Sequence, residues 1–117
     1  MNITLVRFEG VDDIKNAFSE IDVDPVAREI MMEKFQFLVL RFDDVRCVEA
    51  NILKQEMLVL GGEAAVSRHS ISCSVPSTPV LLAGSKKTFR KLCDRIARQV
   101  GSLPEIGQSI DKIILQS

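Results

Sequence analysis

A single histidine, His69, is the side chain best suited to act as an acid or a base near neutral pH. It stands in Ser67-Arg68-His69-Ser70, between two hydroxyl groups. A nucleophile, a base and an orienting acid must converge in space, and adjacency along the chain does not show that they do. We therefore predict that His69 lies in an exposed loop and that no residue of this chain is catalytic.

The three cysteines, Cys47, Cys73 and Cys93, are far apart in the sequence and form no CxxC motif. Zinc requires three or four ligands at suitable spacing, and one histidine with three dispersed cysteines does not supply them, so no metal is predicted. Because the number of cysteines is odd, the sequence indicates reduced thiols and hence a cytoplasmic protein. Cys93 falls on an apolar helix face, where a thiol behaves as a small core residue.

The segment Gly84-Ser85-Lys86-Lys87-Thr88 invites comparison with a phosphate-binding loop. The comparison fails, because the first glycine of GxxxxGK[ST] would fall at Pro79. A weaker anion site at Ser85 and Lys86 stays open, since free N–H groups at a helix start and a nearby lysine can hold a phosphate or carboxylate. The alternative is that Ser85 is a plain N-cap.

A helix is predicted from Val45 to Leu60, and it carries two carboxylates inside its apolar face. Glu49 and Glu56 are seven positions apart and project in nearly the same direction. Either the apolar face has a wet margin where they reach solvent or bond arginine or lysine, or one of them is held by Arg68 or Arg41 at an internal site or subunit contact. The apolar residues of this face are Val45, Val48, Ile52, Leu53, Met57, Val59 and Leu60, with Asn51 and Lys54 opposite.

Gly61-Gly62 ends this helix, because glycine adopts the left-handed conformation without a Cβ penalty. A glycine pair also lets a ligand approach the backbone, although a helix cap is its commoner use. No GxGxxG motif occurs, and no cofactor is predicted.

The composition is that of an ordinary globular protein, with 46% hydrophobic and 26% charged residues. The length of 117 residues predicts one domain, residues 1–117. A net charge of −1 and the absence of Trp and Tyr argue against nucleic-acid binding. No apolar run is long enough to span a bilayer and no signal-peptide pattern is present, so no membrane association is predicted.

The periodicities predict an α/β (α+β) fold in which helices are layered on a small mixed sheet of about four strands. The predicted order is β-α-α-β-α-β-β-α-α. Strands are expected at 3–8, 35–42, 64–67 and 80–83, the second and fourth covered on both faces because they are continuously apolar. The helices other than 45–60 begin near Val11, at Asp24-Pro25, at Gly84-Ser85 and at Ser102, where Glu105 completes the spacing of a capping box.

The run ANILKQEMLVLGGEAAV at residues 50–66 resembles the N-terminal segment that precedes the catalytic barrel in a subset of bacterial and archaeal dihydropteroate synthases. The likeness extends over residues 20–90. It includes Asp24-Pro25, Ile30-Met31, Lys34, Ser74-Val75 and the strand from Val80 to Gly84.

The resemblance implies a non-catalytic accessory or interaction domain associated with dihydropteroate synthase in folate biosynthesis. The pterin chemistry of that family resides in a (β/α)₈ barrel of about 250 residues, which this chain cannot contain. The expected partner is therefore such a barrel or a second copy of the chain. The candidate ligand- or partner-binding residues are Asn51, Lys54, Gln55, Glu56, Gly61, Gly62 and Arg68.

The alternative is a small-molecule or anion-binding domain that uses the Gly61-Gly62 turn or the Gly84-Ser85 helix start. An independent enzyme is disfavoured, because the sequence offers no assembled set of acid, base and nucleophile.

Overall fold

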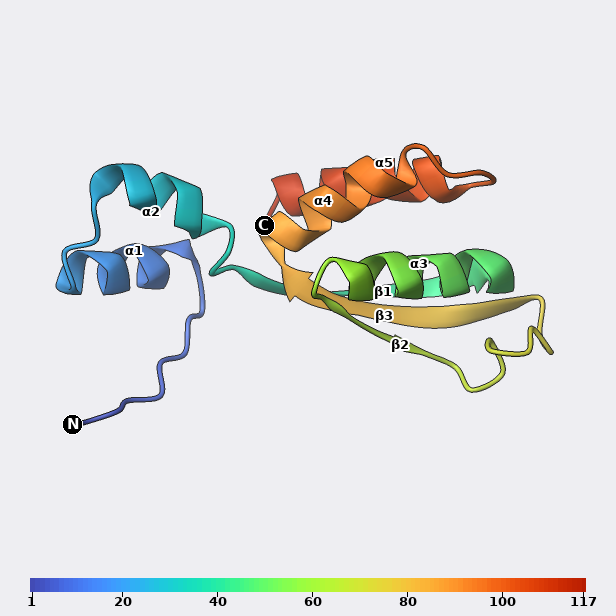
Figure 1. Cartoon of the computed structure of the whole chain (residues 1–117), viewed down its shortest axis with the longest axis horizontal. Helices are drawn as coiled ribbons and strands as arrows, with labels where there is room; N and C mark the ends of the chain where they lie inside the picture. The colour runs from blue at the N-terminus through green and yellow to red at the C-terminus, as the bar shows by residue number, and fades with distance from the viewer.

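A computed structural model describes all 117 residues as five helices and a three-stranded sheet (Figure 1). The mixed α/β class predicted from the sequence is confirmed, with three strands in place of about four. None of the helices is long and apolar enough to cross a membrane. In chain order the elements are α1 (Val11–Glu20), α2 (Pro25–Met32), β1 (Phe37–Arg46), α3 (Cys47–Val59), β2 (Glu63–Val66), β3 (Ser77–Ser85), α4 (Lys86–Ile96) and α5 (Leu103–Leu115).

The sheet is antiparallel throughout, with β3 between β1 and β2. Val39 pairs with Ala83 and Arg41 with Leu81, and the register shifts between Phe42 and Val45. Side chains alternate between the two faces of each strand, and along β3 every second residue is buried. The sheet therefore has one covered face and one open face.

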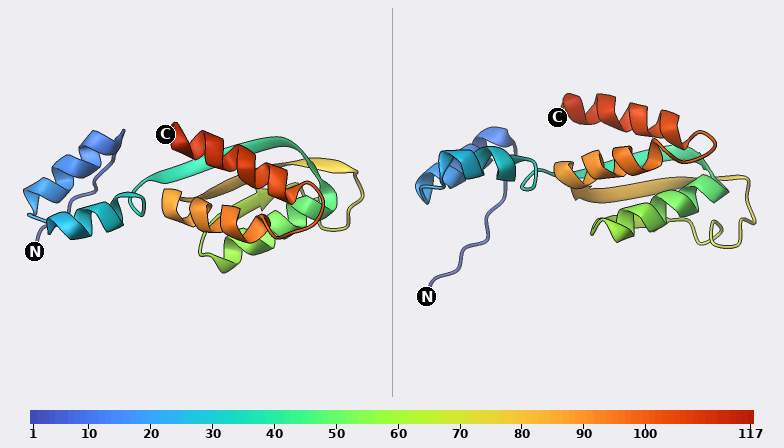
Figure 2. Two further views of the ribbon diagram at one scale, coloured as in Figure 1. Left: turned by 90° about the horizontal axis from the view of Figure 1, so that it is seen from above. Right: turned by 45° about the horizontal axis from the view of Figure 1, so that its top comes forward.

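Helices α3, α4 and α5 cover the same face of the sheet and form a layered body from residue 37 to residue 115 (Figures 1 and 2). The apolar stripe of α4 follows the 3.6-residue period, and Ser85 caps the helix by accepting the Thr88 N–H at 3.1 Å. The core comprises Val45, Ala50, Leu53, Met57, Val80, Leu82, Phe89, Leu92, Cys93, Ile96, Leu103, Ile110 and Ile114.

Helix α3 approaches the sheet closely because two glycines leave room for Met57. A Cβ added at Gly62 would lie 2.7 Å from Met57 Cε and 3.0 Å from the carbonyl oxygen of Ala83, and one added at Gly84 would lie 2.9 Å from the same Cε. Gly61, in the left-handed region at φ +86°, ends the helix as predicted. The glycine pair thus has two separate tasks, a cap and a close contact.

Helices α1 and α2 form a helical arm (residues 11–32) beside the layered body rather than on it (Figures 1 and 2). Asp24 caps α2 by accepting the Val26 N–H at 2.8 Å, as the Asp-Pro pair predicted. Phe18 and Phe35 pack edge to face with ring centroids 5.1 Å apart. Residues 1–8, here called the tail, run past the arm without pairing with any strand.

Four sequence predictions need correction. Residues 3–8 are not a strand, because they pair with none of the three strands. The apolar runs at 35–42 and 80–83 contribute to β1 and β3, but each is covered on one face only. Val48 and Val59 of α3 are exposed, and Ser102 makes no side-chain cap for α5.

Substitution of Gly62 by alanine tests the close contact. We expect Gly62→Ala to lower the free energy of unfolding by about 1–3 kcal/mol, because the new methyl group meets both Met57 and a backbone oxygen. Chemical denaturation monitored by circular dichroism measures the change. Gly10→Ala is the matched control, since nothing lies within 4 Å of its added Cβ. An equal effect of the two substitutions would contradict the packing described here.

Candidate functional site

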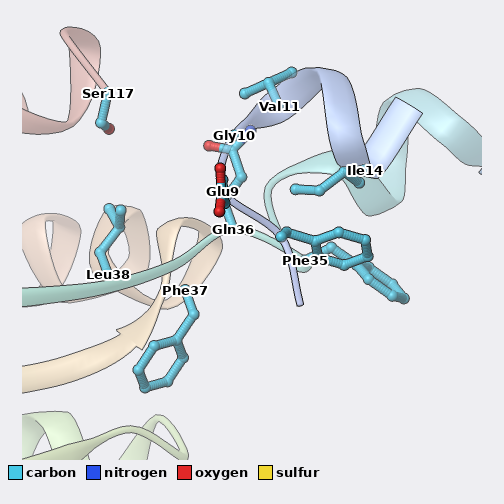
Figure 3. A pocket seen from close by; sticks show the side chains of 10 residues that line it. Glu9, Gly10, Val11, Ile14, Phe35, Gln36, Phe37, Leu38 and Ser117 are labelled. Carbon is cyan, nitrogen blue, oxygen red and sulfur yellow. The ribbon is translucent and has the colours of Figure 1, made fainter. Parts of the chain in front are cut away.

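One hollow of the molecule lies where the helical arm meets the start of β1 (Figure 3). Its volume is about 450 Å³, which is within the range of small-molecule sites. The tail contributes its last residue, and three polar residues, Glu9, Gln36 and Ser117, lie at its border. The apolar lining consists of Phe8, Val11, Ile14, Phe35, Phe37 and Leu38.

The chemistry available in this hollow is apolar contact with a few hydrogen-bonding groups. The backbone N–H of Glu9 donates to Asp13 Oδ2 at 2.8 Å, which fixes the entry into α1. The lining contains no histidine, cysteine or lysine. No group of three or more His, Cys, Asp or Glu side chains in the chain is placed to hold a metal ion. The arrangement suits the binding of an apolar or planar group.

The predicted site residues lie elsewhere, and several of them hold the fold together. Asn51 donates from Nδ2 to the carbonyl oxygen of Ser70 at 2.9 Å and so fixes the loop that follows β2. Lys54 and Gln55 lie on the outer side of α3, with no hydrogen bond or ion pair. Arg68 is exposed in the same loop as His69.

The two glutamates of α3 bind the helices that lie beside it. Glu56 pairs with Arg95 of α4. Glu49 is only 5% exposed, and its Oε2 accepts both the N–H and the Oγ–H of Ser102, at 2.7 and 2.6 Å. This bond occupies the start of α5 in place of the expected capping box.

The proposed internal site involving Arg68 or Arg41 is not formed. Arg41 pairs with Asp43 at 2.8 Å. Glu49 Oε1 is buried without a hydrogen-bond partner, and Arg46 Nε is the nearest cation at 4.0 Å. Glu56, which bonds Arg95, follows the first of the two alternatives, whereas Glu49 is buried and hydrogen-bonded to Ser102 and so lies at no wet margin.

The start of α4, where an anion site was considered, is filled by the chain itself. The N–H groups of Lys86 and Lys87 donate to the carbonyl oxygens of Gln36 and Glu33, at 2.7 and 3.3 Å. The Lys86 ammonium is largely buried and donates to the Ser117 carbonyl oxygen at 3.1 Å. An anion at Ser85 and Lys86 would have to displace the segment that joins α2 to β1.

Cys47 and Cys73 form a disulfide, which corrects the prediction of three reduced thiols. The bond ties the start of α3 to the loop after β2, beside the Asn51–Ser70 hydrogen bond. Only Cys93 is free, and burial raises the pKa of its thiol to about 12. The prediction of a cytoplasmic location was based on three reduced thiols, and two of them form this disulfide.

Comparison with known proteins finds two bifunctional enzymes that are similar to this chain. It is 28% identical over 102 residues to the probable bifunctional folylpolyglutamate synthase/dihydropteroate synthase of Halobacterium salinarum, an alignment covering 87% of this chain and 12% of that protein. It is 26% identical over 106 residues to the bifunctional dihydropteroate synthase/dihydropteroate reductase of Helicobacter pylori, covering 91% of this chain and 28% of that protein. No protein-family model and no solved structure matches the chain.

The hollow at the arm was not predicted from the sequence. Its residues come from two short segments, 8–14 and 35–38, which carry no recognisable motif. The sequence contained one indication of this hollow. Phe35 and Phe37 lie on the same side of a strand that was predicted to be covered on both faces. A second element was therefore needed to cover one of those faces.

Loss of the disulfide should destabilise the protein. Cys47 and Cys73 are 26 residues apart, and the chain-entropy model gives about 3–4 kcal/mol for closing such a loop. We expect Cys73→Ser, or reduction by dithiothreitol, to lower the unfolding free energy of the wild type by this order, measured by urea denaturation. In a Cys47→Ser/Cys73→Ser double variant the reductant should have no effect. If the reductant destabilises the wild type and the double variant equally, it does not act through this disulfide.

The ion pair that joins α2 to α4 should respond to acid. Arg90 donates to Glu33 at 2.6 Å, and this hydrogen bond holds the pKa of Glu33 below its usual 4.5. The ion pair therefore stabilises the fold above about pH 4.5, the usual pKa of this carboxyl group. Its contribution disappears as the pH falls through the lowered pKa of Glu33. Because both side chains are about one-third exposed, Glu33→Gln should cost at most about 1 kcal/mol at pH 7.

This cost should shrink towards zero in acid, as measured by denaturation across the pH range. Glu29→Gln on the exposed side of α2 is the control and should change little at any pH. A constant difference between wild type and Glu33→Gln at all pH values would contradict the ion pair.

Proposed function

We propose that this chain is a non-catalytic interaction domain of folate biosynthesis that acts beside a dihydropteroate synthase. The observation that carries the proposal is what the two similar proteins have in common. The names of both proteins contain dihydropteroate synthase, whereas the second activity is folylpolyglutamate synthase in one and dihydropteroate reductase in the other. The shared activity is the best guide to the process in which the matching segment takes part.

The lengths support a role outside the catalytic barrel. The 106 aligned residues are 28% of the Helicobacter protein, so roughly 270 residues remain, enough for a (β/α)₈ barrel of about 250. The sheet of this chain is antiparallel, whereas the strands of such a barrel are parallel and each is followed by a helix. The fold described above is thus not a fragment of a barrel.

The outer face of α3 is the surface we assign to the synthase. Val48, Ile52, Gln55 and Val59 recur at helical spacing and form one stripe. Val48 and Val59 are 62% and 70% exposed, an unusual cost in water for a helix that already buries its opposite face. Gln55, one of the binding residues suggested by the resemblance, lies within this stripe.

A second candidate function is the reductase activity named for the Helicobacter protein. Reduction of dihydropteroate requires a hydride donor such as a nicotinamide or flavin, which the chain would have to bind. The hollow beside Phe37 favours this alternative, because its apolar walls suit a planar ring and the Glu9 carboxylate can accept hydrogen bonds from an aminopyrimidine edge.

Titration calorimetry with the dihydropteroate synthase of the same organism tests the interaction. We expect the wild type to bind and Val59→Asp to bind at least tenfold more weakly, since a carboxylate would be desolvated in the contact. Val100→Asp, at a residue equally exposed near the end of α4, is the matched control and should bind normally. Absence of wild-type binding, or equal binding by all three proteins, would contradict the proposal.

The reductase alternative is separated by following NADPH oxidation with dihydropteroate, with and without added flavin. We expect no turnover by this chain. Turnover that is lost in Glu9→Ala would replace the proposed role with catalysis at the hollow.

A further inference from the structure

The chain has a larger accessible surface than a compact protein of the same mass. The accessible surface is 8041 Å², whereas a compact protein of 13.0 kDa exposes about 6,300 Å². The radius of gyration is 16.6 Å, against about 13 Å for a compact domain of this length. The excess, roughly 1,700 Å², exceeds the ~800 Å² that each partner buries in a standard interface.

Part of this excess is the open face of the sheet. Phe37 and Val39 of β1 and Leu81 of β3 are 69%, 58% and 43% exposed. Val39 and Leu81 come from neighbouring strands, and with Phe37 they lie on the face opposite the helices. An antiparallel sheet commonly has one wet face, but that face is then polar.

The outer edge of β1 is also open. β1 pairs only with β3, so one side of its backbone has no strand partner. Its second half is protected by Asp43, Asp44 and the register shift after Phe42, devices that discourage strand pairing. Its first half, Phe37–Phe42, has no register shift and carries a single charged side chain, Arg41.

The tail matches this edge in length and pattern. Residues 2–5 alternate between polar and apolar side chains, and Leu5-Val6-Arg7-Phe8 repeats the residue types of Val39-Leu40-Arg41-Phe42. Ile3 and Leu5 are 85% and 79% exposed, so the tail has apolar side chains without contacts as well as unpaired backbone groups. The tail therefore has the sequence of a β-strand but pairs with no other strand.

We propose that the tail adds as a fourth strand to the Phe37–Phe42 edge of a second copy of this chain, giving a dimer in which the tails are exchanged. The partner is a second copy because the tail does not pair with the Phe37–Phe42 edge of its own chain, and contact between two bodies would bury more of the excess surface than one tail does. In a two-fold dimer both tails and both edges are used, and the arrangement closes without forming fibres. The proposal does not depend on the folate role.

Sedimentation equilibrium of the full chain over a range of concentrations tests this dimer. We expect the wild type to dimerise and Val6→Pro to associate at least tenfold more weakly, because proline removes an N–H donor from the added strand. Leu5→Asp should act likewise. Neither substitution should affect folding, since the tail has no strand partner in the monomer. Ile71→Asp, at a residue 74% exposed in another loop, is the matched control and should dimerise normally.

Two results would overturn the proposal. One is a wild type that remains monomeric at all concentrations, which would include the case of a tail paired within its own chain. The other is dimerisation by Val6→Pro and Leu5→Asp with wild-type affinity, which would place the interface elsewhere.

Discussion

The fit of Met57 between Gly62 and Gly84 determines how the layered body is assembled. Because neither glycine has a side chain, α3 lies close to β2 and β3 and buries Leu53 and Met57 completely. The position of α3 in turn sets that of the other two helices, since Glu56 pairs with Arg95 on α4 and Glu49 binds Ser102 at the start of α5. The two carboxylates look misplaced on an apolar face, yet they join the three helices into a single layer.

This construction uses all three large helices on the same side of a sheet of only three strands. The remaining helices, α1 and α2, contact the body mainly through the Glu33–Arg90 pair and the backbone bonds at the start of α4, and leave the opposite face of the sheet uncovered. The chain is therefore well packed on one side and open on the other. The open side is suited to binding another polypeptide, which is the basis of the proposed exchange of tails, whereas the proposed contact with a synthase uses the outer face of α3.

Local signals in the sequence predicted local structure well, except for the capping box at Ser102, whose hydroxyl group donates to Glu49 instead. The Asp24-Pro25 and Ser85 caps, the glycine stop at Gly61 and the period of α4 were confirmed, because each depends on neighbours within one helical turn. Predictions failed where the partner is distant in sequence. The tail has the pattern of a strand, but a strand requires another to pair with; the disulfide joins residues 26 apart; and Glu49 binds a residue 53 positions later. A continuously apolar run such as FQFLVLRF shows that both faces avoid water, and does not show whether this chain or another one covers them.

The central claim is that the outer edge of β1 pairs with another chain, and amide hydrogen exchange of Phe37–Phe42 tests it most directly. Exchange should be recorded at increasing protein concentration, with the central strand β3 as the internal reference. The account predicts that the outward-facing amides of this segment and those of the tail become protected together as concentration rises, while β3 is protected throughout. Exchange of both segments that stays fast at every concentration would contradict it.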